Sequence, residues 1–565
     1  MKQLEKADAA VPRLDHQHRA SISVRRHAVR LVRNAAEAAL PLQKLKEIKL
    51  YNIAAIRARA NPRWNARLSE LLMLLCEPPG MRDVAPEGGV DVPRSRGCTA
   101  ADCAQRCAAG VIRRVSHEEE SERPSLGSMH CFSVVEEARA RRRAIDHPFF
   151  QNEAAYAAGY KSAVELDHVS SLLLSAYADA GCVSDISASF YGLALPTGAR
   201  QFYRFRDNEG NLYEMCRGMM GHTVMAEVQH IITSVIAGHP DFVEQEFYAP
   251  CRVKIWIDNV EYTGGHRAVC YAREQLIEAS VACNAAMQVG EVTRHYVFVG
   301  IEFDLEHHTV RISEKTRNKL PAAIPDVMTA GDLEALFGRL IWTAAVRQEP
   351  LANYYWCLKW ARRLFNRLNR GIVTPEDTVA IRGVARRTLD MWLQQATQTH
   401  VVNRAQQGRV ATLFTDASLD GWGAVLVDDT NRLFIAGARF VGGQALGDIN
   451  SKEAWAVVNA YTAFADKLRS LSRLHHFVDN TSVQAALRRG QPRADALAQQ
   501  TADAWRFIIG ARIELSVDYV STKLNPADAA SRGQVVTVDA VNHAMGHANE
   551  RRGAGSRSRF VVGDP

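Results

Sequence analysis

Long hydrophobic runs are absent from this chain of 565 residues. No stretch approaches the roughly 18 uninterrupted apolar residues that a membrane-spanning helix needs, so we expect no membrane partner. The N-terminus lacks the apolar core of a secretory signal, and 11 cysteines in so large a chain indicate reduced thiols. We therefore expect a protein that is not secreted and that works in the cytoplasm, the nucleus or both.

Acidic residues are scarce at the start of the chain. The first 60 residues hold 13 Lys or Arg against 5 Asp or Glu, a net charge of +8 (13 minus 5), whereas the whole chain carries +7. A basic arm ahead of near-neutral domains indicates a polyanion such as nucleic acid as a partner, although a solvated helical face explains the charge equally well. Apolar residues at helical spacing predict a basic helical region over residues 1–77, with one face at Val29–Ala39 and another at Leu68–Leu75.

Residues 78–125 lack a periodic hydrophobic pattern and are rich in Pro, Gly, Ser and charge, which predicts a linker. Cys98, Cys103 and Cys107 lie within it. Their C-x4-C-x3-C spacing is irregular for a zinc module, so we assign them no function.

From residue 126 the pattern predicts mixed helices and strands. An apolar strand ends at Asp185, and a helix opened by glycine follows Arg217-Gly218. The stretch Lys254–Gly264 predicts a hairpin with Asp258-Asn259 at its tip, because apolar residues alternate on both sides of it. A dense strand follows over 296–304. Taken alone, Asp258-Asn259 is an ordinary turn.

These motifs, in this order, resemble the palm of a reverse transcriptase over roughly residues 139–315, within a fingers and palm region expected over 126–315. The resemblance rests on Asp185 with Phe190 five residues on, Arg217-Gly218, Trp256-Ile-Asp-Asn259 and Val297–Asp304. It implies that Asp185 and Asp258 hold two Mg²⁺ ions for nucleotidyl transfer, with Mn²⁺ as an alternative. Two-metal transfer needs ions about 4 Å apart, and Mg²⁺ prefers oxygen ligands, so carboxylates on adjacent strands suit it.

The resemblance also implies roles for other residues. Phe190 would crowd a ribose 2′-hydroxyl and select deoxynucleotides, although a plain core aromatic is the alternative. Arg217 and Gly218 would lie beneath the template and the incoming nucleotide. Within Arg141–Arg143, we favour Arg142 and Arg143 for the triphosphate, because guanidinium matches phosphate oxygens. Asn259 stands where the family usually has a second Asp, which binds Mg²⁺ better than an amide does.

Residues 316–405 contain two helical stripes. Leu333–Ile341 forms one, and Leu358–Leu368 forms another that is flanked by arginines. The pattern suits a thumb and connection region that contacts the phosphates of a duplex, and it equally suits ordinary packed helices with a solvated face.

Residues 408–540 predict the order βββαβααβα with four acids at strand ends and helix starts: Asp416, Glu453, Asp479 and Asp528. This arrangement resembles ribonuclease H, which implies two Mg²⁺ ions held by these acids. Four clustered carboxylates would repel one another without cations between them. Asp528 alone could cap a helix. The chain has no histidine between His476 and His543, where some retroviral relatives carry one before the last acid. Residues 541–565 predict a disordered basic tail.

The expected fold class is therefore an α+β and α/β multidomain protein, with a right-hand polymerase (fingers, palm and thumb) followed by a ribonuclease H-like domain. The resemblance implies a retroelement enzyme that copies an RNA template from a DNA primer with dNTPs and degrades the RNA of RNA–DNA hybrids. Neither a protease signature nor an integrase is evident. This favours the tyrosine-recombinase group of DIRS, Ngaro and VIPER elements, with a recombinase encoded elsewhere.

Two alternatives remain open at the level of sequence. One is a nucleic-acid-binding protein with a decayed palm and an active ribonuclease H. The other is a host-type ribonuclease H with an unrelated N-terminal adaptor, which would cut hybrids and never extend primers.

Overall fold

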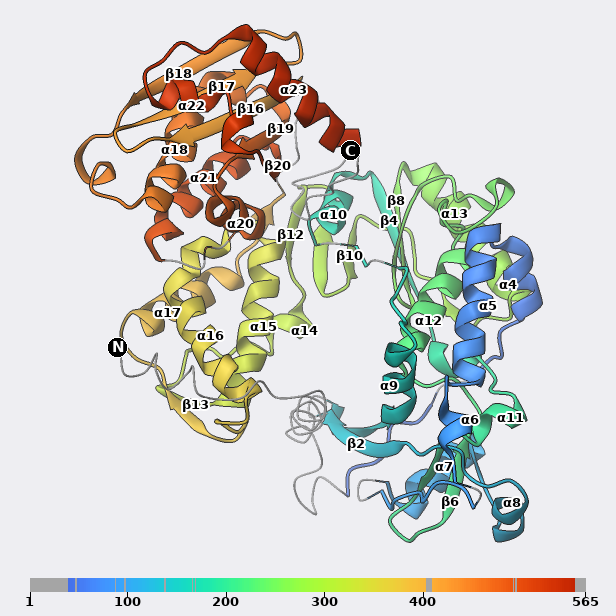
Figure 1. The fold of residues 1–565 in the computed structure, drawn as a ribbon. Coiled ribbons are helices and arrows are strands. Elements are labelled where there is room, and N and C mark those ends of the chain that lie inside the picture. Colours follow the sequence, from blue (N-terminus) through green and yellow to red (C-terminus); the bar gives the residue numbers. More distant parts are fainter. Residues whose placement is uncertain are drawn as a thin grey trace. The chain divides into compact units, whose positions relative to one another are not determined.

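A computed structural model describes residues 39–553, apart from 46–47, 87, 96–97, 137–138, 165, 168, 403–408, 491 and 493–494 (Figure 1). The chain forms two compact units of mixed helices and strands. Unit 1 comprises Met1–Asp167 with Ala178–Val299, and unit 2 comprises His168–Tyr177 with Gly300–Pro565. Within the described residues, no helix combines the length and apolar character needed to cross a membrane. The predicted face Val29–Ala39 lies almost wholly outside the described residues, as does the end of the tail.

The central sheet of unit 1 has the order β7-β8-β4-β9, with every neighbouring pair antiparallel. Its strands are β4 (Ala180–Ile186), β7 (Arg252–Trp256), β8 (Asn259–Gly264) and β9 (Met287–Gln288). The predicted hairpin is thus confirmed as β7 and β8, joined at Ile257-Asp258. Pairing of β8 with β4 sets Asn259 opposite Asp185.

Helices α12 (Thr223–Ile236) and α13 (His266–Ala282) pack on this sheet, and α5 (Pro62–Cys76) packs on α12. Nearly every side chain of α12 is buried, including the polar Glu227, Gln229 and His230 between its apolar residues. In α5 the buried residues include Leu68, Leu71 and Leu75, as the helical spacing predicts. The Asn61 side chain accepts a hydrogen bond from Trp64 N and Pro62 occupies the first turn, so the start of α5 is well specified.

Residues 78–125 are not the predicted linker. They form α6 (Met81–Val84), α7 (Ala100–Ala108), β1 (Ile112–Arg114) and α8 (His117–Glu122). Strand β1 pairs with β6 (Leu212–Met215), which pairs in turn with β5 (Arg204–Arg206). Some charged residues of this segment are buried in pairs with later residues, such as Arg106 with Asp146, so the composition resembles a linker although the segment is folded.

Unit 1 also contains a separate antiparallel hairpin of β2 (His130–Glu136) and β3 (Arg141–His147). Nearby, Cys98 and Cys103 are buried with their sulfur atoms 3.3 Å apart, and α7 carries Cys103. Among the described residues, these thiols do not form a group of three metal-ligating side chains.

Unit 2 begins with β11 (Ile301–Asp304), β12 (Thr309–Ile312) and β15 (His400–Val401), which form an antiparallel ladder. The strand predicted over 296–304 is divided, because Val299 and Gly300 both have positive φ and end β10 (His295–Phe298). Helices α15 (Ala330–Val346), α16 (Tyr355–Asn369) and α17 (Gly383–Ala396) share a core that includes stacked Tyr354 and Trp392.

The large sheet of unit 2 has the order β18-β17-β16-β19-β20. Strands β16, β17 and β18 form an antiparallel meander, whereas β19 and β20 join it in parallel. The strands are β16 (Arg409–Ala417), β17 (Gly421–Val427), β18 (Leu433–Arg439), β19 (Leu471–Val478) and β20 (Glu514–Tyr519). Helices α18 (Ile449–Ala463), α20 (Thr481–Arg489), α21 (Ala498–Gly510) and α22 (Ala527–Ser531) complete the predicted order of elements.

The two faces of this sheet belong to different cores, since successive side chains of a strand point to opposite sides. Leu413 packs with residues of α18, α20 and α21, whereas Phe414 packs with residues of α22 and α23 (Val538–Gly553). Helix α23 corrects the prediction of a disordered tail over 541–553, because Val541 and Ala544 are buried in the second core.

Candidate active sites

Asp185 and Asp258 meet at one edge of the unit 1 sheet. Asp185 lies near the end of β4, and Asp258 lies in the turn between β7 and β8. The backbone N–H of Ile186 donates to the Asp258 carbonyl oxygen at 3.1 Å, which ties the turn to β4. Ile257 adopts a left-handed φ of 59°, an uncommon conformation for a β-branched residue and one that tight turns and active sites retain.

Both carboxylate oxygens of Asp258 accept a hydrogen bond. Ser189 Oγ donates to Oδ2 at 3.0 Å, and Asn259 Nδ2 donates to Oδ1 at 2.9 Å. Burial raises the pKa of Asp258, and these two donors oppose the rise because they favour the ionised form. Asn259 therefore orients Asp258 through its amide nitrogen. Sequence reasoning missed Ser189, whose one signal is its place between Asp185 and Phe190.

The two acids line a cavity of about 690 Å³ together with Phe190. Phe190 is half-buried in the single-turn helix η3 (Ser189–Gly192). The same cavity is lined by five basic residues: Lys44, Arg106, Arg139, Arg141 and Arg143. The Arg106 guanidinium is buried in a pair with Asp146. A pocket with two carboxylates and several cations can hold a polyanion and a divalent metal together.

Arg142 does not line this cavity. It is buried, and its guanidinium forms two hydrogen bonds of 2.8 Å with the two oxygens of Asp102. Residues alternate sides along β3, so Arg141 and Arg143 point to the cavity while Arg142 points into the protein. The expectation for Arg142 is thus corrected, because breaking a buried bidentate pair to bind a ligand would be costly. Arg143 lines the cavity and also pairs with Glu136 at 2.7 Å.

Arg217 and Gly218 lie beside the cavity instead of lining it. Arg217 Nε donates to the Gly110 carbonyl at 3.1 Å. A Cβ at Gly218 would lie 2.7 Å from the Phe190 carbonyl oxygen, so only glycine allows this close approach. Gly218 therefore supports the backbone that carries Phe190.

The second site lies in unit 2, at the carboxyl ends of two parallel strands. Asp416 is near the end of β16, Asp479 directly follows β19, and Glu453 comes from the first turns of α18. Strands β16 and β19 are neighbours, with Thr415 opposite Val478, so their ends meet. Ligand oxygens of the three acids all lie within 4.8 Å of one another.

Burial and mutual repulsion perturb these acids strongly. The pKa of Asp416 rises to about 7 and that of Glu453 to about 9, first through burial and then through the charge of Asp479. Asp479 Oδ1 is buried and accepts no hydrogen bond from the described part of the chain. An orphaned carboxylate oxygen beside two further acids fits a divalent cation with oxygen ligands, such as Mg²⁺.

Asp528, the fourth predicted ligand, stays outside the group of three. It lies in α22, and Arg532 binds both of its oxygens through contacts of 2.8 to 3.1 Å. Helix α22 approaches closely because Gly423, the β17 partner of Asp416, has no side chain. A Cβ there would lie 2.2 Å from Ser531 N.

Neighbours that sequence reasoning missed hold Asp416 in place. Ser531 Oγ donates to Asp416 Oδ2. Behind it, the buried Thr415 hydroxyl contacts His476 Nε2 at 2.9 Å, and His476 Nδ1 contacts the Tyr461 hydroxyl at 2.9 Å. Burial lowers the pKa of His476 to about 3, so this imidazole stays neutral and links the Thr415 and Tyr461 hydroxyls through its two nitrogens.

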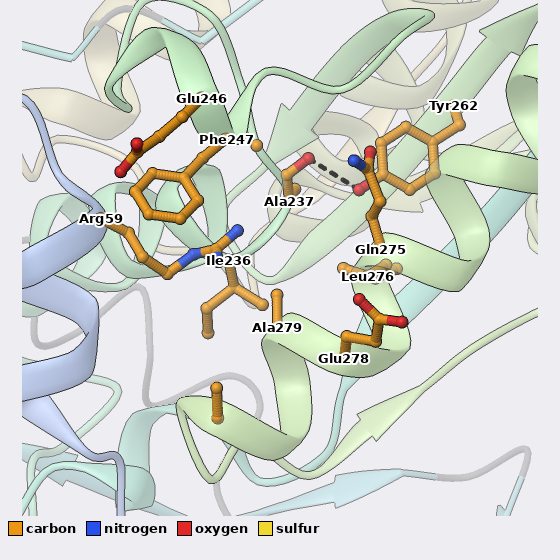
Figure 2. A pocket seen from close by; sticks show the side chains of 12 residues that line it. Arg59, Ile236, Ala237, Glu246, Phe247, Tyr262, Gln275, Leu276, Glu278 and Ala279 are labelled. Carbon is orange, nitrogen blue, oxygen red and sulfur yellow. Dashed lines mark hydrogen bonds between the residues drawn. The ribbon is translucent and has the colours of Figure 1, made fainter.

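A further cavity of about 280 Å³ in unit 1 shares no lining residue with the carboxylate pocket. Figure 2 shows the Arg59 guanidinium beside the Phe247 ring, with 4.3 Å from Arg59 Cζ to the ring centroid. Arg59 Nε is buried without an acceptor in the described residues. Glu246 and Glu278 also line the cavity, so its charges oppose one another and indicate no single class of ligand.

No family model matches the sequence, and no curated protein matches it. Among solved structures, the chain is similar to foamy viral protease-reverse transcriptase in a complex with double-stranded DNA, at 11% identity and a TM-score of 0.45 over 85% of this chain and 84% of that one. A complex of the foamy viral enzyme with an RNA/DNA hybrid gives 12% identity and a TM-score of 0.43, covering 85% of this chain and 64% of that one. Similarity at such TM-scores carries no argument about function, which is inferred from the carboxylates.

Proposed function

We propose that this chain is a retroelement RNA-directed DNA polymerase that also has ribonuclease H activity. The observation that carries the proposal is the presence of two separate carboxylate sites in one chain. One joins Asp185 and Asp258 to a cation-lined cavity, and the other joins Asp416, Glu453 and Asp479. Two-metal phosphoryl chemistry accounts for both.

In the first site, Asp185 and Asp258 would hold two Mg²⁺ ions, and Ser189 and Asn259 would fix the Asp258 carboxylate. Arg143, with Lys44, Arg139 and Arg141, would bind the triphosphate of a dNTP, and Phe190 would contact its sugar. The primer 3′-hydroxyl would attack the α-phosphate with pyrophosphate leaving. The template would be RNA and the primer DNA.

In the second site, Asp416, Glu453 and Asp479 would hold the metal, with Asp528 as a fourth ligand. Water would attack a phosphodiester of the RNA strand in an RNA–DNA hybrid, leaving a 5′-phosphate and a 3′-hydroxyl. Bound Mg²⁺ would supply an activated hydroxyl and neutralise charge on the phosphate in both sites, with Mn²⁺ as an alternative. The hybrid would be recognised by shape and by the 2′-hydroxyl.

We assign fingers and palm to residues 126–315, a thumb and connection to 316–405, and ribonuclease H to 408–540. Within retroelements, the motif order favours the DIRS, Ngaro and VIPER group with a recombinase encoded elsewhere, in the cytoplasm or nucleus. One observation favours a second candidate function. Asn259 donates to Asp258 where an acid would add a ligand, which suits a nucleic-acid-binding protein with a decayed palm and an active ribonuclease H.

One experiment separates these functions. RNA-templated primer extension and hybrid cleavage are measured side by side for the wild type, Asp185→Ala and Asp416→Asn. The proposal expects extension to be lost only in Asp185→Ala and cleavage only in Asp416→Asn. A wild-type chain that cleaves hybrids without extending primers in Mg²⁺ or Mn²⁺ contradicts the polymerase and leaves a ribonuclease H, with either a decayed palm or an unrelated N-terminal adaptor. A wild-type chain that does neither contradicts both functions.

A further inference from the structure

Arg532 is the unexpected member of the unit 2 site. It directly follows α22, one helical turn after Asp528, and its Nε and terminal nitrogen donate to both carboxylate oxygens. The Arg532 side chain is 53% exposed and the Asp528 side chain 30% exposed. Solvent and ions therefore reach this pair, unlike the buried Asp416.

The pair lies beside the acid group. Ser531, the residue before Arg532, donates to Asp416 Oδ2. The hydrogen bonds to Asp528, the charge of Asp528 and then the charge of Asp416 raise the pKa of Arg532. Arg532 thus places a fixed positive charge next to carboxylates that repel one another.

The neighbouring lysine does not share this role. Lys452 precedes Glu453 in α18, but its Nζ donates to the Leu419 carbonyl at 2.6 Å and lies near the Phe440 ring. Its direction is set by those contacts. Arg532 is therefore the cation whose hydrogen bonds reach a predicted metal ligand.

We propose that Arg532 competes with divalent metal for Asp528, as a positioning residue that holds this carboxylate outside the group of three until a cation replaces the guanidinium. The inference rests on the proposed ribonuclease function and deepens it. A carboxylate oxygen that accepts from Arg532 has less free electron density for a metal, and the guanidinium repels an incoming cation. Arg532 thereby sets the metal concentration at which the site fills.

The test measures binding of Mn²⁺ to the full-length chain without nucleic acid. Binding is detected as the loss of the free Mn²⁺ signal in electron paramagnetic resonance. Asp185→Ala and Asp258→Ala are present throughout, so that the unit 1 site does not contribute. We expect Arg532→Ala to lower the half-saturating Mn²⁺ concentration about two- to fivefold, the range expected for loss of an exposed ion pair. Arg532→Lys keeps the charge without the bidentate contact and should fall between Arg532→Ala and wild type.

Arg506 provides the matched control. It pairs with Asp503 on α21 of the same unit, and the two side chains are 52% and 28% exposed, nearly the same as Arg532 and Asp528. It also donates to Asn353 Oδ1 at 3.3 Å, away from the acids. Arg506→Ala should leave Mn²⁺ binding unchanged while removing the same net charge.

Unchanged or weaker Mn²⁺ binding in Arg532→Ala overturns the inference, and so does an equal gain in Arg506→Ala. Circular dichroism melting identifies any variant that fails to fold, in which case Arg532→Lys decides alone. Hybrid cleavage is measured in parallel for the parent chain, which carries Asp185→Ala and Asp258→Ala and keeps Arg532. This measurement separates failure of the proposed function from failure of the role of Arg532. If the parent neither binds Mn²⁺ nor cleaves, the proposed function fails; if it does both and Arg532→Ala binds no tighter, only the role of Arg532 fails.

Discussion

At the scale of single residues, Asn259 decides how the first carboxylate site is built. Its amide nitrogen donates a hydrogen bond to Asp258 Oδ1, so its role differs from that of an aspartate that would bind the metal through an oxygen. The sequence shows which residue stands there, but the direction of the hydrogen bond depends on the turn geometry and could not be predicted.

Replacing Asn259 by Asp should destabilise the metal-free protein, because a donor is lost and a like charge is placed beside the half-buried Asp258 carboxylate. We expect a loss of about 1–3 kcal/mol in the free energy of unfolding without metal, and partial recovery with Mg²⁺. Asn259→Ala, which loses only the donor, is the control. Equal unfolding curves for the two variants in EDTA would contradict the prediction.

The unit 2 acids predict a pH dependence of stability. The folded-state pKa values of Asp416 and Glu453, about 7 and about 9, are higher than those of exposed carboxyls, so the folded state binds more protons than the unfolded state between about pH 4 and pH 9. The stability of the metal-free protein should therefore fall as pH rises through this window, by at most about 1.4 kcal/mol per pH unit for each group.

Urea unfolding in EDTA at a series of pH values measures this slope. Glu453→Gln should flatten it, since the amide does not titrate, and saturating Mg²⁺ should reverse it by stabilising the ionised acids. A stability that rises from pH 6 to pH 8 in the metal-free wild type is incompatible with the expected direction.

At the scale of elements, the turn that carries Phe190 depends on its contact with Gly218. A Cβ at Gly218 would press on the Phe190 carbonyl and on Met225 Cε, both at 2.7 Å, and the backbone contact cannot move cheaply. Gly218→Ala should lower the free energy of unfolding by about 1–3 kcal/mol and reduce primer extension more than hybrid cleavage.

Gly198→Ala is the matched control for this change. Gly198 lies in α11 (Thr197–Arg200), and a Cβ there meets no atom within 4 Å. Alanine in a helix should leave stability the same or slightly higher. A Gly218→Ala protein as stable and active as Gly198→Ala would show that the close approach is not needed.

Elements differed in how well the sequence predicted them. The strands around Asp258 and Asp416 alternate apolar and polar residues or are uniformly apolar, and their order along the chain was predicted correctly. Residues 78–125 were missed because their stability comes from long-range partners: β1 pairs with β6, and Arg106 is buried against Asp146 at 2.7 Å. Helix α23 was missed because the residues that pack on the core, Val541, Ala544 and Met545, stand within a polar sequence. Arg142 and Arg143 are adjacent in sequence, and only the strand register shows which one faces the cavity.

At the scale of the whole molecule, each compact unit holds one carboxylate site. Metal that binds only the folded state raises the free energy of unfolding by RT ln(1 + [L]/Kd), where [L] is the free metal concentration and Kd its dissociation constant. In calorimetry we expect Mg²⁺ to raise the unfolding temperature through both sites, with about 1–3 kcal/mol from each at saturation.

Variants should divide this effect between the units. Asp416→Asn should remove the part that belongs to unit 2, and Asp185→Ala the part that belongs to unit 1. The double variant should show no response to Mg²⁺. A double variant stabilised as strongly as wild type would mean that the metal binds elsewhere.

The parallel pairing of β16 with β19 has a consequence for the order in which the two carboxylate sites are completed. Asp416 needs Asp479 to complete its site, and the two strands can pair only after the meander and α18 have been made. Asp185, Asp258 and the cavity around them are all encoded earlier. Under the proposed function, a polypeptide still emerging from the ribosome would therefore complete its nucleotide-binding site before its hybrid-cleaving site.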